Sequence, residues 1–142
     1  MKKNDLIHAW DLVSFELRKE NGEVIYPFGK NVAGRIIYTA SGDFSAQVMR
    51  ENRPMFKSND QMKGSVEEVM DNFKGVISYF GRYTFDDNII THHVEASLFP
   101  NWKGLSMKRF ARLNNSLLEL STEPTTWHGE NSIGILIWRK KE

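Results

Sequence analysis

The sequence predicts a mainly β protein: a closed antiparallel barrel of about eight or nine strands with one amphipathic helix. Short runs of alternating apolar and polar residues fill most of the 142-residue chain, and turn-forming pairs separate many of these runs. One segment alone has the three- and four-residue spacing of a helix. The length is close to that of one ordinary domain, so we expect residues 1–142 to form a single domain.

The predicted strands follow the alternating runs along the chain. These runs cover residues 7–18, 24–26, 32–40, 43–49, 82–86, 89–99, 106–113, 116–122 and 132–140. The turn pairs at their ends are Asn21-Gly22, Ser41-Gly42, Asp87-Asn88 and Asn114-Asn115. Because such short turns join antiparallel neighbours, the sheet is expected to be antiparallel.

Residues 66–80 are predicted to form the helix. Ser65 precedes them as an N-cap, and acidic residues occupy the first turn. The apolar residues at helical spacing are Val66, Val69, Met70, Phe73, Ile77 and Phe80. Gly75 inside the segment costs about 1 kcal/mol relative to alanine, and Gly81 is a suitable stop. We expect this helix to pack at the barrel mouth or against the barrel wall.

Closure of the sheet is favoured because it removes the exposed strand edges that invite aggregation. The interior of a barrel of about eight strands is either filled by side chains or holds one small ligand. A two-sheet sandwich needs a similar number of strands and is the structural alternative.

The composition excludes several classes of function. There are no cysteines, which removes disulfides, thiolate metal ligands and thiol nucleophiles. The formal net charge is +1, so no strong field attracts nucleic acid or an anionic membrane. No apolar run approaches the roughly 20 residues of a membrane span, and the N-terminus lacks a signal-peptide pattern. We therefore expect a cytoplasmic protein without nucleic-acid or membrane partners and without a cofactor.

Six segments carry a family likeness, and they occur in order along nearly the whole chain. They read WDLVSFE at residues 10–16, YTASGDFSAQ at 38–47, FGRY at 80–83, HHVEASLFPNW at 92–102, KRF at 108–110 and LELST at 118–122. Together they resemble the lipocalin-like domain family, a branch of the calycin barrels. The resemblance implies a β-barrel with a cavity more firmly than it implies any particular reaction.

Trp10 resembles the lipocalin tryptophan that closes one end of the barrel. The resemblance implies that an arginine covers its ring, and Arg109 and Arg139, both in late strands, are the candidates. A cation stacked on indole contributes about 0.5–2 kcal/mol. The chain departs from the family pattern at His8, where lipocalins usually have glycine, and at Met107, where family members often have glutamine.

The Ser41-Gly42 turn predicts how two neighbouring strands face the barrel. A two-residue loop places Tyr38 opposite Ser45 and brings Gln47 to the same face. That face is amphipathic, whereas the other face of the two strands is apolar. Either the amphipathic face is exposed to solvent, or Tyr38, Ser45 and Gln47 line a ligand cavity.

Residues 92–95, His-His-Val-Glu, hold the most chemically suggestive side chains. Alternation places His93 and Glu95 on one face of the strand and His92 on the other, packed face. A carboxylate beside an imidazole can raise the histidine pKa, which suits a proton-transferring pair or a group that orients a ligand carbonyl. The alternative is a polar stripe that faces solvent. The spacing supplies no third or fourth metal ligand, so no metal site is expected.

The leading hypothesis is a protein that binds a small apolar or aromatic molecule in the barrel cavity. Trp102, in a predicted loop, either rims the cavity mouth or plugs the barrel end. Because an unpaired buried charge costs several kcal/mol, Glu95 and Arg109 are expected to lie either both inside or both outside. The expected ligand-binding residues are Tyr38, Ser45, Gln47, His93, Glu95, Arg109 and Trp102.

An enzyme is the alternative hypothesis, of the isomerase, cyclase or dehydratase type. In that case His93 and Glu95 would transfer a proton of a small apolar substrate, and Arg109 would stabilise developing negative charge. A structural or interaction domain with a filled barrel is the third hypothesis.

Overall fold

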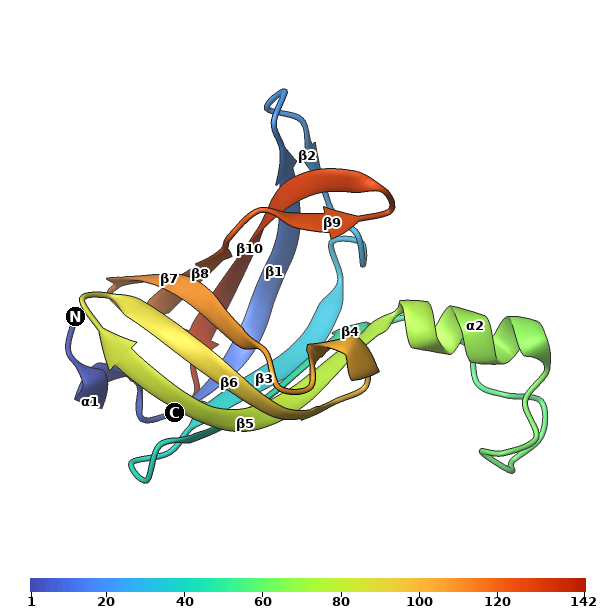
Figure 1. Cartoon of the computed structure of the whole chain (residues 1–142). Helices are drawn as coiled ribbons and strands as arrows, with labels where there is room; N and C mark the ends of the chain where they lie inside the picture. The colour runs from blue at the N-terminus through green and yellow to red at the C-terminus, as the bar shows by residue number, and fades with distance from the viewer.

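The computed structural model describes residues 1–142 and is a closed β-barrel (Figure 1). The barrel strands are β1 (Ala9–Lys19), β3 (Val32–Tyr38), β4 (Asp43–Arg50), β5 (Val76–Asp86), β6 (Ile89–Ser97), β7 (Ser106–Asn114), β8 (Leu117–Thr122) and β10 (Glu130–Lys140). The remaining elements are α1 (Lys3–Leu6), β2 (Val24–Ile25), α2 (Val66–Lys74), the short 3₁₀ helix η1 (Pro100–Trp102) and β9 (Thr125–Trp127).

The eight barrel strands form one continuous ring in the order β1-β3-β4-β5-β6-β7-β8-β10, and β10 pairs with β1 to close it. Every neighbouring pair is antiparallel. The short strands β2 and β9 extend β1 and β10 beyond the ring (Figure 1). The closed antiparallel barrel is therefore confirmed, and the sandwich alternative is wrong. No helix has the length and apolar character needed to cross a membrane.

One end of the barrel is closed by α1 and Trp10. The indole of Trp10 is only 1% exposed, and its N–H donates to the carbonyl oxygen of Leu6 at 3.0 Å. The expected arginine does not cover the ring: Arg109 faces the barrel interior from β7, and Arg139 is exposed opposite Asp11. A backbone carbonyl of α1 thus provides the polar partner of this tryptophan, so the prediction of an arginine contact is wrong.

The helix α2 is shorter than predicted and begins with a full capping box. Ser65 accepts from the backbone N–H of Glu68, and the Glu68 carboxylate accepts from the backbone N–H of Ser65. The helix ends at Lys74, because Gly75 caps it and the β-prone residues from Val76 onward pair with β4. Ile77 and Phe80, which fit helical spacing, therefore belong to β5.

The helix α2 extends away from the barrel, so the expectation that it packs at the mouth or wall is wrong (Figure 1). A single residue, Gly75, joins it to β5, so the helix continues outward from the strand end. The salt bridge from Arg50 to Asp71, at 2.8 Å, ties it to the end of β4. Its apolar side chains remain exposed, and they are Val66, Val69, Met70 and Phe73.

The hairpin between β3 and β4 has a loop of three residues rather than two. The backbone N–H of Thr39 donates to the carbonyl of Asp43, which leaves residues 40–42 in the loop, and Gly42 takes the positive φ of 92° that such a loop requires. Tyr38 consequently pairs with Phe44 rather than with Ser45. The predicted pairing is wrong by one residue, and a slip of one residue exchanges the two faces of a strand.

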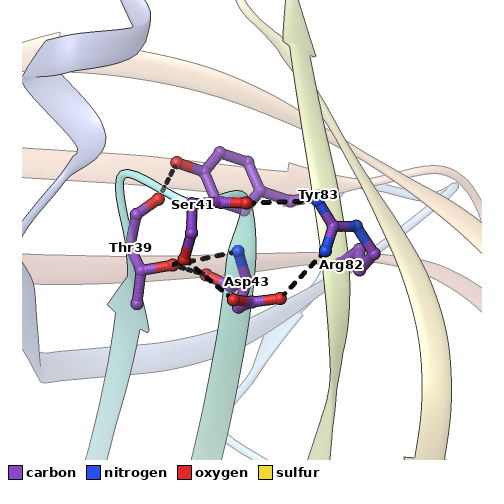
Figure 2. Close-up of polar contacts among 5 residues, drawn as sticks. All are labelled: Thr39, Ser41, Asp43, Arg82 and Tyr83. Carbon is purple, nitrogen blue, oxygen red and sulfur yellow. Dashed lines mark hydrogen bonds and ion pairs between the residues drawn. The ribbon is translucent and has the colours of Figure 1, made fainter.

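Side-chain contacts hold this longer loop in place (Figure 2). The Thr39 hydroxyl accepts from the Asp43 backbone N–H at 3.0 Å, and the Ser41 hydroxyl donates to the Asp43 carboxylate at 2.9 Å. From β5, Arg82 donates to the Ser41 carbonyl at 3.1 Å, and the Tyr83 hydroxyl donates to the Thr39 carbonyl at 2.7 Å. The neighbouring strand thus helps to fix the loop length and the register.

The pairing of β5 with β6 contains a bulge at Glu95. Gly81 pairs with Val94 and Phe80 with Ala96, so Glu95 has no partner in the ladder. A Cβ atom on Gly81 would overlap the carbonyl oxygen of His93, so only glycine permits this close approach. At this bulge the alternation of inward and outward side chains along β6 is interrupted.

Candidate functional site

The barrel interior contains a cavity of about 420 Å³. Fourteen of the 24 residues that line it are hydrophobic. The inward side chains of β1, β3, β4, β7, β8 and β10 form much of its apolar wall, and they include Phe15, Leu17, Ile36, Ala46, Val48, Met107, Leu120, Leu136 and Trp138. Trp102 of η1 and Trp127 of β9 also line the cavity. The volume falls within the range typical of small-molecule pockets.

The polar side chains of this wall include a buried histidine that lies between two tyrosines. The Nε2 atom of His92 lies 2.7 Å from the Tyr38 hydroxyl, and its Nδ1 atom lies 3.1 Å from the Tyr79 hydroxyl. The ring of Phe44 stacks on the imidazole at 4.1 Å between centroids, with an interplanar angle of 13°. His92 is 1% exposed, and both His92 and Tyr79 line the cavity.

This histidine is neutral in the folded protein. Burial holds the pKa of His92 well below its ordinary value of 6.5, and the charge of Arg109 and the neighbouring His93 lower it further. Burial also raises the pKa of Tyr38 well above its ordinary value, so its hydroxyl keeps its proton. A neutral imidazole with one hydroxyl at each nitrogen has both hydrogen-bonding positions filled.

Arg109 brings a positive charge to the same wall. On β7 it pairs with Ile90, whereas its neighbour on the inward face, Met107, pairs with His92. Arg109 and His92 are therefore diagonal neighbours across two strands. The guanidinium donates to the carbonyl of Lys108 at 3.0 Å and forms no ion pair with any carboxylate.

The cavity wall also includes two indole groups without hydrogen-bond acceptors. The Nε1 atoms of Trp127 and Trp138 are buried and have no partner within the protein, and Trp138 is 2% exposed. Both side chains line the cavity. No three histidine, aspartate or glutamate side chains lie close enough together to hold a metal ion.

The structure separates the residues that were expected to form one site. Trp102 and Arg109 line the cavity. Tyr38 lies buried behind His92 and reaches the wall only through that imidazole. Because the hairpin register differs from the prediction, Ser45 and Gln47 are on the outer face, where the Gln47 amide donates to the Ser45 hydroxyl at 3.1 Å.

His93 and Glu95 also lie outside the cavity. The Nδ1 atom of His93 is 2.9 Å from the Ser106 hydroxyl, and Glu95 is exposed at the bulge. The predicted alternation of residues 92–94 is right, but its inward face carries His92, so the solvent-facing interpretation of the polar stripe applies. Arg109 lies inside and Glu95 outside, so the prediction that they share one side is wrong.

Two polar groups of the wall, His92 and Tyr79, were missed by the sequence reasoning. His92 shares its face with Ile90 and Val94, and this apolar context was itself a sign of an inward position. Tyr79 was hidden inside the segment assigned to the helix. A histidine at an inward position of a strand needs buried hydroxyl or carbonyl partners, and Tyr38 and Tyr79 supply them.

Comparison with known proteins gives a family match over nearly the whole chain. The family model of the lipocalin-like domain matches residues 8–141. A relative from Aspergillus oryzae is 34% identical over 105 residues, which cover 68% of this chain and 95% of the relative. It is named 4'-hydroxy-3'-methoxypropiophenone carrier protein ppsC.

One solved structure is also similar. A crystal structure of an uncharacterized protein from Bacteroides eggerthii aligns over 96% of this chain and 100% of its own, with 15% identity and a TM-score of 0.47. This likeness is too distant to carry an argument about fold or function.

Proposed function

The chain belongs to the lipocalin-like domain family, and we propose that it binds one small aromatic molecule inside its barrel. The observation that carries this proposal is the cavity of about 420 Å³, which is lined mainly by aliphatic and aromatic side chains. Apolar walls with a few placed polar groups are typical of small-molecule sites. The tyrosine–histidine cluster and Arg109 supply those polar groups.

The chemical class of the ligand is proposed from the cavity and the relative together. Aromatic side chains on several sides favour a flat, aromatic ligand, and the relative's name describes the carrying of an aromatic ketone. Burial of roughly 300 Å² of ligand surface at about 25 cal/mol per Å² gives an upper limit of about 7.5 kcal/mol, or a dissociation constant no smaller than about 3 µM. Burial of the ligand surface is therefore sufficient for micromolar binding.

We propose no proton transfer by His93 and Glu95. Both side chains lie outside the cavity, so they do not reach a molecule bound within it. The three residues His93, Glu95 and Arg109 are not brought together, so they do not form the proton-transfer site of that hypothesis.

A fluorescence titration tests the proposed function. Three of the four tryptophans line the cavity, so a ligand bound there should change the tryptophan emission. The probe is 4'-hydroxy-3'-methoxypropiophenone. We expect saturable binding in the micromolar range by the unmodified protein.

A cavity-filling variant provides the matched control for this titration. Ala46 faces the cavity, so Ala46→Leu should weaken binding at least tenfold, whereas Ser45→Leu on the outer face of the same strand should bind like the unmodified protein. Circular dichroism checks that both variants fold. The proposal fails if the unmodified protein shows no saturable binding or if Ala46→Leu binds equally well.

A further inference from the structure

We propose that the cavity takes an acidic phenol as its anion, with the phenolate oxygen bound by the Tyr79 hydroxyl and the Arg109 guanidinium. The inference rests on the proposed function and adds the ionic form of the ligand and the two groups that recognise it. Three observations carry it: the two hydrogen bonds of the buried His92, the place of Tyr79 on the cavity wall, and the unpaired charge of Arg109.

The order of hydrogen bonds around His92 follows from burial. A neutral imidazole has one N–H donor and one acceptor nitrogen. The Tyr38 hydroxyl is buried, and its only partner is the Nε2 atom of His92. If Nε2 carried the proton, the Tyr38 O–H would have no acceptor at all, which is strongly unfavourable. Tyr38 therefore donates to Nε2, and the proton of His92 is on Nδ1.

This order leaves the proton of Tyr79 free. The Nδ1–H of His92 donates to the Tyr79 oxygen, at 3.1 Å, so the Tyr79 O–H is not used within the cluster. Tyr79 lines the cavity, and its ring is held edge-on between Phe44, at 5.4 Å, and Trp102, at 5.2 Å. Its hydroxyl is consequently a fixed donor to an acceptor atom of a ligand.

Arg109 adds a charge that the protein itself does not neutralise. It lies diagonally across the strands from His92 and forms no ion pair with a carboxylate. Arg109 lines the cavity together with His92 and Tyr79, so the guanidinium and the tyrosine–histidine cluster face the same space. A cation beside an apolar cavity is stabilised by a ligand anion.

The two exposed ionisable groups of the wall do not change this assignment. Lys108 and Glu123 also line the cavity, but both are exposed, and Glu123 makes no ion pair with Arg109. The indole N–H groups of Trp127 and Trp138 are covered by other atoms, so we assign the ligand contact to Tyr79 and Arg109.

A phenolate matches this pair of donors better than a carboxylate. The charge of a phenolate spreads into its ring, and the cavity is lined mainly by apolar and aromatic side chains that contact such a ring.

The ionisation of a bound phenol tests the inference by absorbance. The probe is 4'-hydroxy-3'-methoxypropiophenone, whose phenol and phenolate forms absorb at different wavelengths. We expect the phenol pKa in the complex to lie at least about one unit below that of the free probe. Affinity should then rise with pH between the bound and the free pKa, by tenfold for each unit that separates them.

Three variants test which residues lower the pKa of the bound phenol. Arg109→Met should abolish most of the pKa lowering, and Tyr79→Phe should abolish part of it. Arg112→Met removes an exposed arginine from the outer face of the same strand and should leave the lowering unchanged. A lowering that survives in Arg109→Met would overturn the assignment.

A probe whose phenol oxygen is methylated tests the binding of the anion without any variant. 3',4'-Dimethoxypropiophenone cannot ionise, so the unmodified protein should bind it more weakly, with an affinity that does not change with pH. Saturable binding of the phenol with an unshifted pKa would overturn the anion assignment and leave the proposed function intact. Absence of saturable binding by both probes would overturn the proposed function and this inference together.

Discussion

At the scale of single residues, His92 shows how burial decides the state of an ionisable group. Its imidazole is stacked on Phe44 and bonded to two tyrosine hydroxyls, so folding removes it from water in the neutral form. The unfolded chain holds the same imidazole in water, where it gains a proton below its ordinary pKa of 6.5. Stability must therefore depend on pH through this residue.

The first prediction concerns that dependence. Because the folded pKa of His92 is lowered, its contribution to the free energy of unfolding is complete above about pH 6.5. Below that pH the contribution falls by up to about 1.4 kcal/mol per pH unit, until the folded pKa is reached. Urea unfolding should therefore show that the stability difference between the unmodified protein and His92→Gln narrows from about pH 7 to about pH 5.

The neighbouring histidine is the control for this measurement. His93→Gln keeps the buried imidazole of His92, so the fall in its stability from about pH 7 to about pH 5 should be close to that of the unmodified protein. A stability difference for His92→Gln that is the same at both pH values would show that His92 is not held neutral by folding.

Residue-level chemistry was only partly predictable from the sequence. The alternation of side chains along a strand correctly placed His92 and His93 on opposite faces, because this alternation depends only on local backbone geometry. The apolar neighbours of His92 indicated its packed face, but the sequence left open whether the polar stripe of His93 and Glu95 faces a wet cavity or the outer surface. The partners of His92 come from β3 and β5, and no local pattern connects three strands.

At the scale of elements, the barrel end depends on one tryptophan and one helical turn. Trp10 fills the space under α1, and its indole N–H satisfies a carbonyl of that turn. Trp10→Ala should therefore lower the free energy of unfolding by about 3–5 kcal/mol, as for other large aromatic side chains lost from a core.

A second substitution separates packing from hydrogen bonding at this tryptophan. Trp10→Phe keeps much of the buried ring but removes the bond to Leu6, so it should cost clearly less than Trp10→Ala. Urea unfolding curves give both values. An unchanged melting temperature for Trp10→Ala would contradict the closing role of this residue.

The bulge of β6 makes another element-scale prediction. A methyl group on Gly81 would overlap the His93 carbonyl, so Gly81→Ala should destabilise the protein by about 1–3 kcal/mol or more. Thr84→Ala, at an exposed position of the same strand, should change stability by less than about 0.5 kcal/mol. Equal effects of the two substitutions would contradict the close approach of β5 and β6.

Elements were predicted best where one local signal was sufficient. The strands that follow Asp87-Asn88 and Asn114-Asn115 begin near the expected positions, because residues of these turns adopt positive φ angles. The loop at Ser41-Gly42 was misjudged, since Arg82 and Tyr83 of a neighbouring strand help to hold it. The end of α2 was misjudged because Ile77 and Phe80 suit both a helix and a strand.

At the scale of the whole molecule, closure of the ring determines the interior. Each barrel strand has two neighbours, so its inward side chains face one shared space. Eight strands enclose a space that side chains fill only in part, and this leaves the cavity. The sequence predicted the closed barrel through its turn spacing, but the cavity wall required the register of every strand pair.

Closure also bears on domain organisation, and we propose that residues 1–142 form one domain. One ring around one core should unfold in a single cooperative transition, so melting curves followed by tryptophan emission and by far-ultraviolet circular dichroism should coincide. Two separated transitions would contradict a single domain.

The structure of a complex with 4'-hydroxy-3'-methoxypropiophenone tests the central claim most directly. We predict one molecule inside the barrel, with its ring against the side chains of Val48, Leu120 and Trp138 and its phenolic oxygen near Tyr79 and Arg109. A probe found only outside the barrel, for example on the exposed apolar side chains of α2, would contradict the assignment of the cavity as the binding site.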